Sequence, residues 1–262
     1  MTSGETLSRE GDSAGNGIGD NAEAITGIVV LAHGGRSVGT EPTSPFQLAV
    51  LRMIPLGQAI KYALRGSGAA VCRPRFQVRG WNGEQASPVA DLSGILDRIA
   101  CEYGPVPIVL IGHSMGARAA CRAAGHPAVS AVAGLAPWLP PGEPVSQLAG
   151  RRVLLVHGSA DRITSPDETW AYAERAAAVT EVAAVEIRGG EHTMLRRAPL
   201  WHRIAAEFAR LALGLPGNTT DDPTANATGN TTASTTANTT DDATELSAAL
   251  AGTSGVPLRT LL

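Results

Sequence analysis

Short runs of apolar residues recur along the middle of the chain, each bounded by turn-forming residues. Residues 28–32 read Ile-Val-Val-Leu-Ala and run directly into His33-Gly34-Gly35. Runs of this length, rich in Val and Ile and without alternating polar positions, are typical of strands buried on both faces of a sheet. The sequence therefore predicts six strands, at residues 28–32, 69–72, 107–111, 129–135, 153–156 and 182–187.

Apolar residues at helical spacing fill the stretches between these runs. Several stretches begin at a proline and end at a glycine, which are the residues preferred at the first turn and just beyond the last turn of a helix. Ser87 and Ser165 each precede such a proline and are expected to cap the helices that follow. The predicted helices are residues 55–65, 88–103, 115–124, 166–179 and 199–213.

The alternation of strands and helices determines the fold class. Strands joined by helices favour right-handed crossovers and a parallel sheet covered on both faces. We therefore expect an α/β fold, a three-layer α/β/α sandwich around a mostly parallel sheet of about six strands. Ligands of such sheets bind beyond the carboxyl ends of the strands, so functional residues are sought in the loops that follow them.

The two ends of the chain differ in composition from its middle. Residues 1–26 are rich in Gly, Ser, Asp and Glu, and residues 215–262 are dominated by Thr, Asn, Asp and Ala. Such segments have too few apolar side chains to offset the entropy cost of ordering. We expect a disordered segment at 1–26, one folded domain at 27–214 and a low-complexity tail at 215–262, whose last residues, 246–262, are weakly apolar.

Composition and charge exclude several classes of function. Lys plus Arg number 21 against 24 Asp plus Glu, a formal charge of −3, so no basic surface for nucleic acid is expected. The three cysteines lack metal-ligand or disulfide spacing, and we expect neither a metal nor another cofactor. The chain shows no secretory signal and no apolar run of the roughly 18 residues that span a membrane, so a cytoplasmic protein without membrane contact is expected.

The segment Gly112-His113-Ser114-Met115-Gly116 fits the pattern G-x-S-x-G. It directly follows the predicted strand at 107–111 and begins an Ala-rich helix, which is the strand–turn–helix setting of a nucleophilic serine. A sharp turn lifts the Ser114 hydroxyl away from the sheet, and the glycines avoid crowding neighbouring backbone. The alternative is a glycine-flanked serine at an ordinary turn. The context favours Ser114 as a nucleophile.

The chain resembles the α/β-hydrolase superfamily, in particular lidless serine hydrolases of the carboxylesterase or dienelactone-hydrolase type. The resemblance covers about residues 27–214 and includes the chain order serine, acid, histidine. It implies that Asp161, in the loop after the strand at 153–156, orients the base, with Asp167 and Glu168 as rivals. It implies that His192, in a glycine-rich loop after the last predicted strand, is the base.

The resemblance also implies an oxyanion hole, in which two backbone N–H groups hold the charge that develops on a substrate carbonyl oxygen. One is expected from Met115, and the other from Gly35 in the loop after the first strand, although the sequence does not separate Gly35 from Arg36. Trp81 and Trp138 follow strands at the same edge, and either form an acyl pocket or pack the loops. The loop beginning at Arg36 is expected to border the pocket.

Relatives with a lid carry an inserted cap domain after the strand that follows the nucleophile. Here only residues 137–152 lie at that place, so an open site without a cap domain is expected. The predicted function is a serine hydrolase that cleaves a small-molecule carboxylic ester or thioester through an acyl-enzyme intermediate. The alternatives are a short-peptide or amide hydrolase with the same three residues, and a non-catalytic binding protein with this fold.

Overall fold

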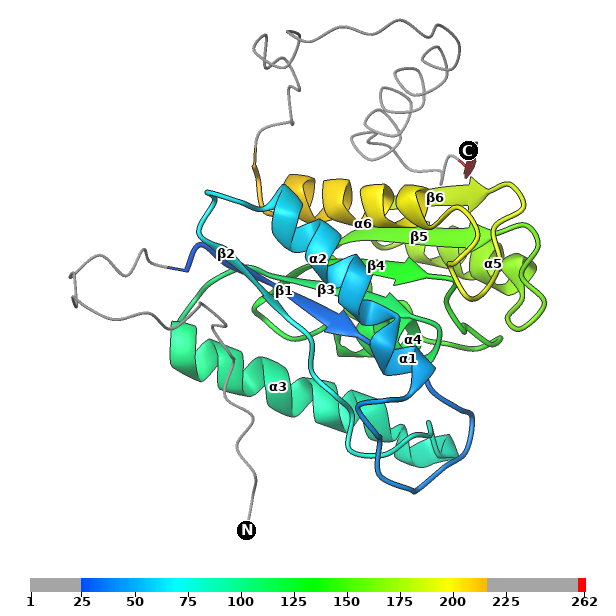
Figure 1. Ribbon diagram of the computed structural model, residues 1–262, viewed down its shortest axis with the longest axis horizontal. Helices are drawn as coiled ribbons and strands as arrows, with labels where there is room; N and C mark the ends of the chain where they lie inside the picture. The colour runs from blue at the N-terminus through cyan, green and yellow to red at the C-terminus, as the bar shows by residue number, and fades with distance from the viewer. Residues whose placement is uncertain (1–24, 216–258) are drawn as a thin grey trace, which may run out of the picture.

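A single parallel sheet forms the centre of the molecule. The computed structural model describes residues 25–215 and 259–262, and these residues form a sheet with the order β2-β1-β3-β4-β5-β6-β7 (Figure 1). All six strands predicted from the sequence are present, and the three-residue β7 is added beside β6. The strands are β1 Gly27–Ala32, β2 Ala69–Cys72, β3 Ile108–His113, β4 Val129–Leu135, β5 Arg152–Gly158, β6 Val182–Ile187 and β7 Arg259–Leu261.

Helices cover both faces of the sheet. The helices α2 and α6 pack on one face, and α3, α4 and α5 pack on the other (Figure 1). The expected three-layer α/β/α sandwich is confirmed. The helices are α1 Leu48–Leu51, α2 Met53–Ala63, α3 Ser87–Tyr103, α4 Met115–Ala123, α5 Pro166–Ala177 and α6 Ala198–Ala212, and two 3₁₀ turns, η1 Gly83–Gln85 and η2 Ser146–Leu148, lie in loops.

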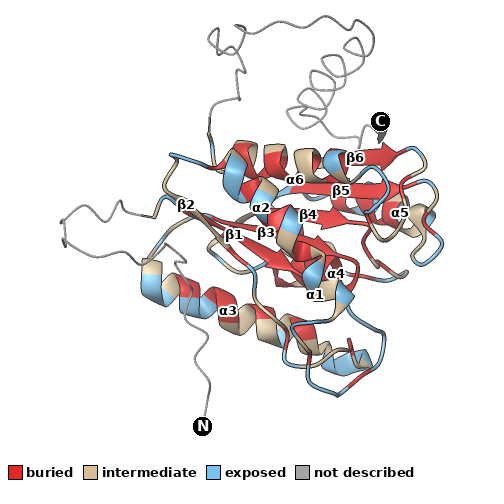
Figure 2. Ribbon diagram, in the orientation of Figure 1, coloured by how far each residue is buried: buried red, intermediate tan, exposed pale blue. Residues whose placement is uncertain are grey.

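The strands are apolar throughout because their side chains enter two separate cores. In β1, Ile28 and Val30 pack with α3 and α4, whereas Val29 and Leu31 pack with α2 and α6. Figure 2 shows the central strands buried along their length between the two helical layers. Each strand therefore needs apolar residues at consecutive positions, which explains the uninterrupted runs in the sequence.

The order of the strands creates a crevice at one edge of the sheet. From β1 the chain passes to β2 at the edge and then returns to β3 on the other side of β1. The connections that follow β1 and β3 therefore lead in opposite directions and separate at the carboxyl ends of these strands. His33 follows β1 and Ser114 follows β3, so both lie at this crevice.

One of the two predicted helix caps is correct. The Ser165 hydroxyl accepts a hydrogen bond from the Glu168 N–H at 3.3 Å and caps α5. The prediction for Ser87 was wrong, because Ser87 is the first residue of α3 and Ala86 precedes it in a left-handed conformation. Its hydroxyl instead accepts from the side-chain amide of Asn82 at 3.2 Å.

The residues around β7 lie within the segment predicted as a tail. The N–H of Leu262 donates to the carbonyl of Glu186 at 2.9 Å, and the N–H of Arg188 donates to the carbonyl of Leu262 at 2.8 Å. These contacts extend the sheet beyond the predicted limit of residue 214. Most of both predicted terminal segments, residues 1–24 and 216–258, lies outside the described residues, and their character remains a prediction.

Candidate active site

Ser114 occupies the turn between β3 and α4. Its backbone has φ 55° and ψ −118°, a conformation that costs a residue with a side chain about 1–3 kcal/mol. The turn is held because the Ser114 N–H donates to the Leu135 carbonyl at 3.1 Å, while the Ser114 carbonyl accepts from the N–H groups of Ala117 and Arg118. The hydroxyl therefore lies at the N-terminus of α4, where free N–H groups favour negative charge.

The two glycines of the motif permit close backbone approach on both sides of the turn. A Cβ on Gly112 would lie 2.4 Å from the backbone of Ala117 in α4. A Cβ on Gly116 would lie 2.2 Å from the carbonyl oxygen of Ala32 in β1. Side chains at either position would force α4 away from the sheet, so the spacing of the glycines follows from the geometry of the turn.

The structure brings Ser114, His192 and Asp161 together at the carboxyl edge of the sheet. The His192 Nε2 lies 3.0 Å from the Ser114 Oγ, and the His192 Nδ1 lies 2.8 Å from the Asp161 Oδ2. Asp161 comes from the loop after β5 and His192 from the loop after β6. With Nδ1 protonated and donating to Asp161, the unprotonated Nε2 can accept the serine proton.

The carboxylate of Asp161 is buried and held by several donors. Its Oδ1 accepts from the N–H groups of Ile163 at 2.8 Å and Thr164 at 3.1 Å. Burial alone would raise the pKa of Asp161, but hydrogen bonds from His157, His192 and these two N–H groups outweigh burial and hold its pKa well below the usual range. Asp161 is therefore ionised near neutral pH.

His113 secures the loop that carries His192. Its Nε2 donates to the His192 carbonyl at 2.8 Å, and the centres of the two rings lie 5.0 Å apart. Burial, together with the nearby His192 and Arg52, lowers the pKa of His113 to about 3. His113 therefore remains neutral near neutral pH. The sequence showed it only as the residue before Ser114, with no indication of this contact.

Two backbone N–H groups near Ser114 lack an internal acceptor. Within the described ranges, the N–H groups of Gly35 and Met115 donate to no protein atom, whereas the N–H of Arg36 donates to the Arg79 carbonyl at 2.9 Å. A Cβ added to Gly35 would lie 2.3 Å from the Met115 side chain, so the two residues are in close contact. The arrangement favours Gly35 over Arg36 as a donor to a bound oxyanion.

His33 fixes the peptide unit that carries the Gly35 N–H. Its Nε2 accepts from the N–H of Phe76 at 3.0 Å, so the proton lies on Nδ1, which is 2.7 Å from the Gly34 carbonyl oxygen. In a trans peptide the carbonyl and the following N–H point in opposite directions. Holding the Gly34 carbonyl therefore also sets the direction of the Gly35 N–H.

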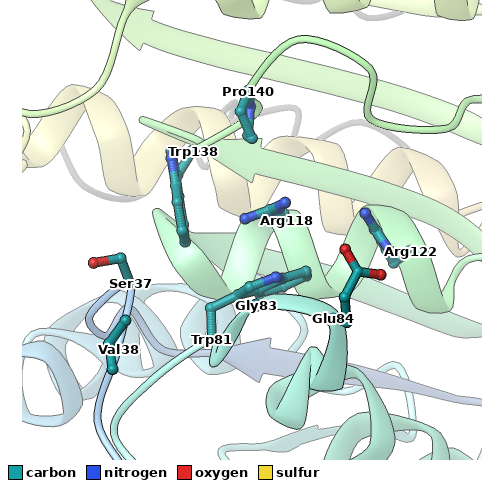
Figure 3. Close-up of a pocket in the computed structure, with 9 residues that line it drawn as sticks. All are labelled: Ser37, Val38, Trp81, Gly83, Glu84, Arg118, Arg122, Trp138 and Pro140. Carbon is teal, nitrogen blue, oxygen red and sulfur yellow. The ribbon is translucent and has the colours of Figure 1, made fainter.

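A pocket of about 400 Å³ lies near this site: Trp138, one of the residues that line it, donates its backbone N–H to the Ser114 carbonyl, whereas Ser114, Asp161 and His192 are not among the lining residues. The rings of Trp81 and Trp138 meet edge to face with centres 6.1 Å apart (Figure 3). Of the residues predicted to bind substrate, Trp81 and Trp138 line it, but the exposed Arg36 does not. The lining residues are Ser37, Val38, Trp81, Gly83, Glu84, Arg118, Arg122, Trp138 and Pro140.

A buried ion pair supports the wall of this pocket. The Arg118 guanidinium lies over both indole rings, 3.9 Å from the centre of Trp81 and 4.4 Å from that of Trp138. Its Nε donates to Glu143 at 2.7 Å, as does the Nε of Arg122. Burial would raise the pKa of Glu143, but hydrogen bonds from both arginines lower it. Sequence reasoning missed Arg118 and Glu143, which carry no motif.

Neither a metal centre nor a membrane span is found among the residues that the structure describes. No group of three His, Cys, Asp or Glu side chains there is arranged to hold a metal ion. No helix in those ranges is both long enough and apolar enough to cross a bilayer.

Comparisons with known proteins establish the fold. No family model matches the chain, and no curated protein matches it. Solved structures do match it, among them a serine hydrolase without lid from Xanthomonas campestris, with TM-score 0.52 and 18% identity over 76% of this chain and 87% of that one. An esterase domain from a Rhodothermus marinus protein gives TM-score 0.51 and 20% identity over 74% and 90%. Est1E from Butyrivibrio proteoclasticus with bound ferulic acid gives TM-score 0.52 and 14% identity over 72% of this chain and 90% of that one.

The class of protein follows from these likenesses together with the topology. The chain has the α/β-hydrolase fold, without a cap domain between β4 and β5. Its structural neighbours include serine hydrolases and esterases. The resemblance drawn from the sequence motifs is thereby confirmed at the level of the fold.

Proposed function

We propose that the protein is a serine hydrolase that cleaves carboxylic ester or thioester bonds through an acyl-enzyme intermediate. The observation that carries the proposal is the continuous hydrogen-bonded chain from Asp161 through His192 to Ser114. In the acylation step, the Ser114 oxygen bonds to the substrate carbonyl carbon while its proton passes to His192 Nε2. The same proton then goes to the leaving alcohol or thiol as its bond to the carbonyl carbon breaks.

Deacylation repeats these steps with water in place of Ser114. His192 takes a proton from the water molecule, whose oxygen bonds to the acyl carbon. The bond between that carbon and the Ser114 oxygen then breaks, His192 returns the proton to Ser114, and the acid leaves. Asp161 remains ionised throughout and stabilises the imidazolium that forms in each step. The depressed pKa of Asp161 supports this role.

The oxyanion of each tetrahedral intermediate is assigned to the N–H groups of Gly35 and Met115. Met115 follows Ser114 in the chain, Gly35 packs against the Met115 side chain, and the N–H groups of both lack an acceptor within the described protein. Losing one such donor in other enzymes raises the barrier by about 2.7–4 kcal/mol. His33 keeps the Gly35 donor aimed before substrate arrives, so little reorganisation is needed in the reaction.

The pocket lined by Trp81 and Trp138 is assigned to the acyl group. Its indole rings and short aliphatic side chains favour an apolar or aromatic group over a charged one, since Glu143 pairs with both arginines of the wall and Glu84 lies near Arg122. Est1E, which shares the fold, holds ferulic acid, an aromatic acid. We therefore expect p-nitrophenyl esters of phenyl-substituted acids to be hydrolysed with higher kcat/KM than the acetate.

A fluorophosphonate probe tests the assignment of the nucleophile. The wild-type protein should be labelled and should hydrolyse p-nitrophenyl esters, and Ser114→Ala should lose both properties while its melting temperature is retained. Ser37→Ala is the matched control, because Ser37 is an exposed serine that lines the same pocket. Equal labelling of the Ser114→Ala protein would reject the proposal.

A further inference from the structure

A second histidine contacts the carboxylate of Asp161. His157 lies in β5, its side chain is fully buried, and its Nε2 is 3.0 Å from the Asp161 Oδ2. Its Nδ1 lies 2.7 Å from the hydroxyl of Thr169 in α5. His157 does not touch Ser114 in any recorded contact, so the proton transfers described above do not use it.

The contacts of His157 fix the position of its proton. Because the ionised Asp161 is only an acceptor, the Nε2 of His157 must carry a hydrogen and donate it. The Nδ1 then accepts the hydroxyl proton of Thr169. Both ring nitrogens are therefore engaged, and the imidazole presents a fixed N–H to the acid.

We propose that His157, which touches no reacting atom itself, shares the Asp161 Oδ2 with His192 and thereby makes His192 a weaker base. The inference rests on the function proposed above. One oxygen accepts from both imidazoles, at 3.0 Å from His157 and 2.8 Å from His192. A strong hydrogen bond partly neutralises the negative charge of the carboxylate oxygen that accepts it. That oxygen then attracts a second donor less, so it stabilises the imidazolium of His192 less.

The alternative is that His157 merely holds Asp161 in place. The orientation of the carboxylate is already set by its other oxygen, because Oδ1 accepts from the N–H groups of Ile163 and Thr164. The Thr164 hydroxyl adds a further contact to Oδ2 at 3.0 Å. What His157 adds acts on the one oxygen that faces His192, and its effect is therefore electrostatic.

Other titratable or charged groups lie near this set in the structure or along the chain, and they are the same in every variant. The ring of His113 is 5.0 Å from that of His192, and Glu186 of β6 lies beside His157 in the sheet register. None of these groups is altered in the comparison below. They are Arg52, His113, Arg162, Asp167, Glu168, Glu186 and Glu191.

The pH dependence of kcat/KM separates the electrostatic role from a packing role. The acidic limb of the profile reports protonation of the base in the free enzyme. In His157→Phe a larger share of the Oδ2 charge acts on His192, and the midpoint of this limb should rise by about 0.5–1 pH unit. The plateau value of kcat/KM, reached above this limb, should fall less than about tenfold, because Ser114, His192 and Asp161 are all retained.

Two further variants complete the comparison. His157→Gln, whose amide can donate to Asp161, should return the midpoint to within about 0.2 pH unit of the wild type. Thr169→Val removes the partner of Nδ1 but leaves the Nε2 donor, and its midpoint should stay near the wild-type value. A His157→Phe protein with a lower plateau and an unmoved midpoint, or a midpoint that moves down, overturns the proposal.

Heteronuclear NMR of the imidazoles gives a readout that needs no activity. In the wild-type protein, His157 should carry its proton on Nε2, and a proton found on Nδ1 alone overturns the proposal. The titration of His192 in His157→Phe should show the same upward shift as the kinetic limb. If the wild-type protein neither hydrolyses esters nor reacts with the fluorophosphonate, the proposed function fails, and the NMR titration still decides whether His157 and His192 share Asp161.

Discussion

Replacing Asp161 with asparagine changes one carboxylate oxygen to an amide group. The amide oxygen can still accept from the N–H groups of Ile163 and Thr164, so the side chain should keep its place. The amide nitrogen then faces His157 and His192, and its two hydrogens suffice to donate to both. Each imidazole must move its proton to its other nitrogen.

The consequence for catalysis follows from the new position of the His192 proton. A protonated Nε2 faces the Ser114 hydroxyl and cannot take its proton, and no carboxylate remains to stabilise the imidazolium. A wrong tautomer of this kind lowers kcat about 10,000-fold in a serine protease, equivalent to about 5.5 kcal/mol of barrier. We expect a loss of this order, measured by hydrolysis of p-nitrophenyl acetate.

The same substitution has a defined effect on stability. The N–H groups of Ile163 and Thr164 and both imidazoles can remain bonded to residue 161, and only the Thr164 hydroxyl, which donates to Oδ2, loses this acceptor. We therefore expect the free energy of unfolding to fall by only about 1–2 kcal/mol near neutral pH, as charged hydrogen bonds become neutral ones. The folded-state pKa of Asp161 is depressed. Its stabilisation is therefore present above the unfolded-state pKa of about 3.9 and is lost as pH falls below it. Melting temperatures of variant and wild type should converge in acid.

Asp167→Asn is the matched control for this experiment. Asp167 is an exposed acid in the first turn of α5, and the structure records no contact between it and His192. We expect its turnover to stay within about twofold of the wild type, as for most exposed substitutions. The reasoning is refuted if Asp161→Asn retains turnover within tenfold of the wild type, or if Asp167→Asn loses it.

Three further substitutions test other parts of the site. In Gly116→Ala the new Cβ would lie 2.2 Å from the Ala32 carbonyl oxygen, so urea unfolding should show a loss of at least about 2 kcal/mol. In His33→Phe the proposed oxyanion donor, the Gly35 N–H, is no longer held, so kcat should fall about 10–100-fold with KM nearly unchanged. An effect on KM alone would contradict this expectation. Glu143→Gln leaves Arg118 with a weaker partner and should cost about 1–3 kcal/mol near neutral pH. Because the folded-state pKa of Glu143 is lowered, this difference should shrink below about pH 4.

The fold could be predicted because each strand contributes to two cores and must be apolar at consecutive positions. The convergence of Ser114 and His192 followed from topology, because residues after parallel strands share one edge of the sheet. Short elements gave no such signal. The helix α1 buries no residue, and the three residues of β7 lie in a segment of unlike composition. Nothing in their sequence distinguishes them from loops.

The partners of the central residues could not be predicted either. His33 and His157 were visible only as histidines before glycines at strand ends, and the sequence does not record which atoms they meet in space. The choice between Gly35 and Arg36 was left open for the same reason. It depends on a hydrogen bond from Arg36 to Arg79, which lies on another loop. Such contacts are consequences of the folded backbone and become visible only with it.

On the proposed role of Ser114 as nucleophile, its strained backbone sets stability against activity. At φ 55° and ψ −118° a glycine meets little steric resistance, whereas serine and alanine do. A chain with glycine at this position should therefore melt at a higher temperature than one with alanine, although both lack the hydroxyl. A library sorted only for thermal resistance would accordingly accumulate inactive members at position 114, so engineering of this protein has to select for turnover at the same time.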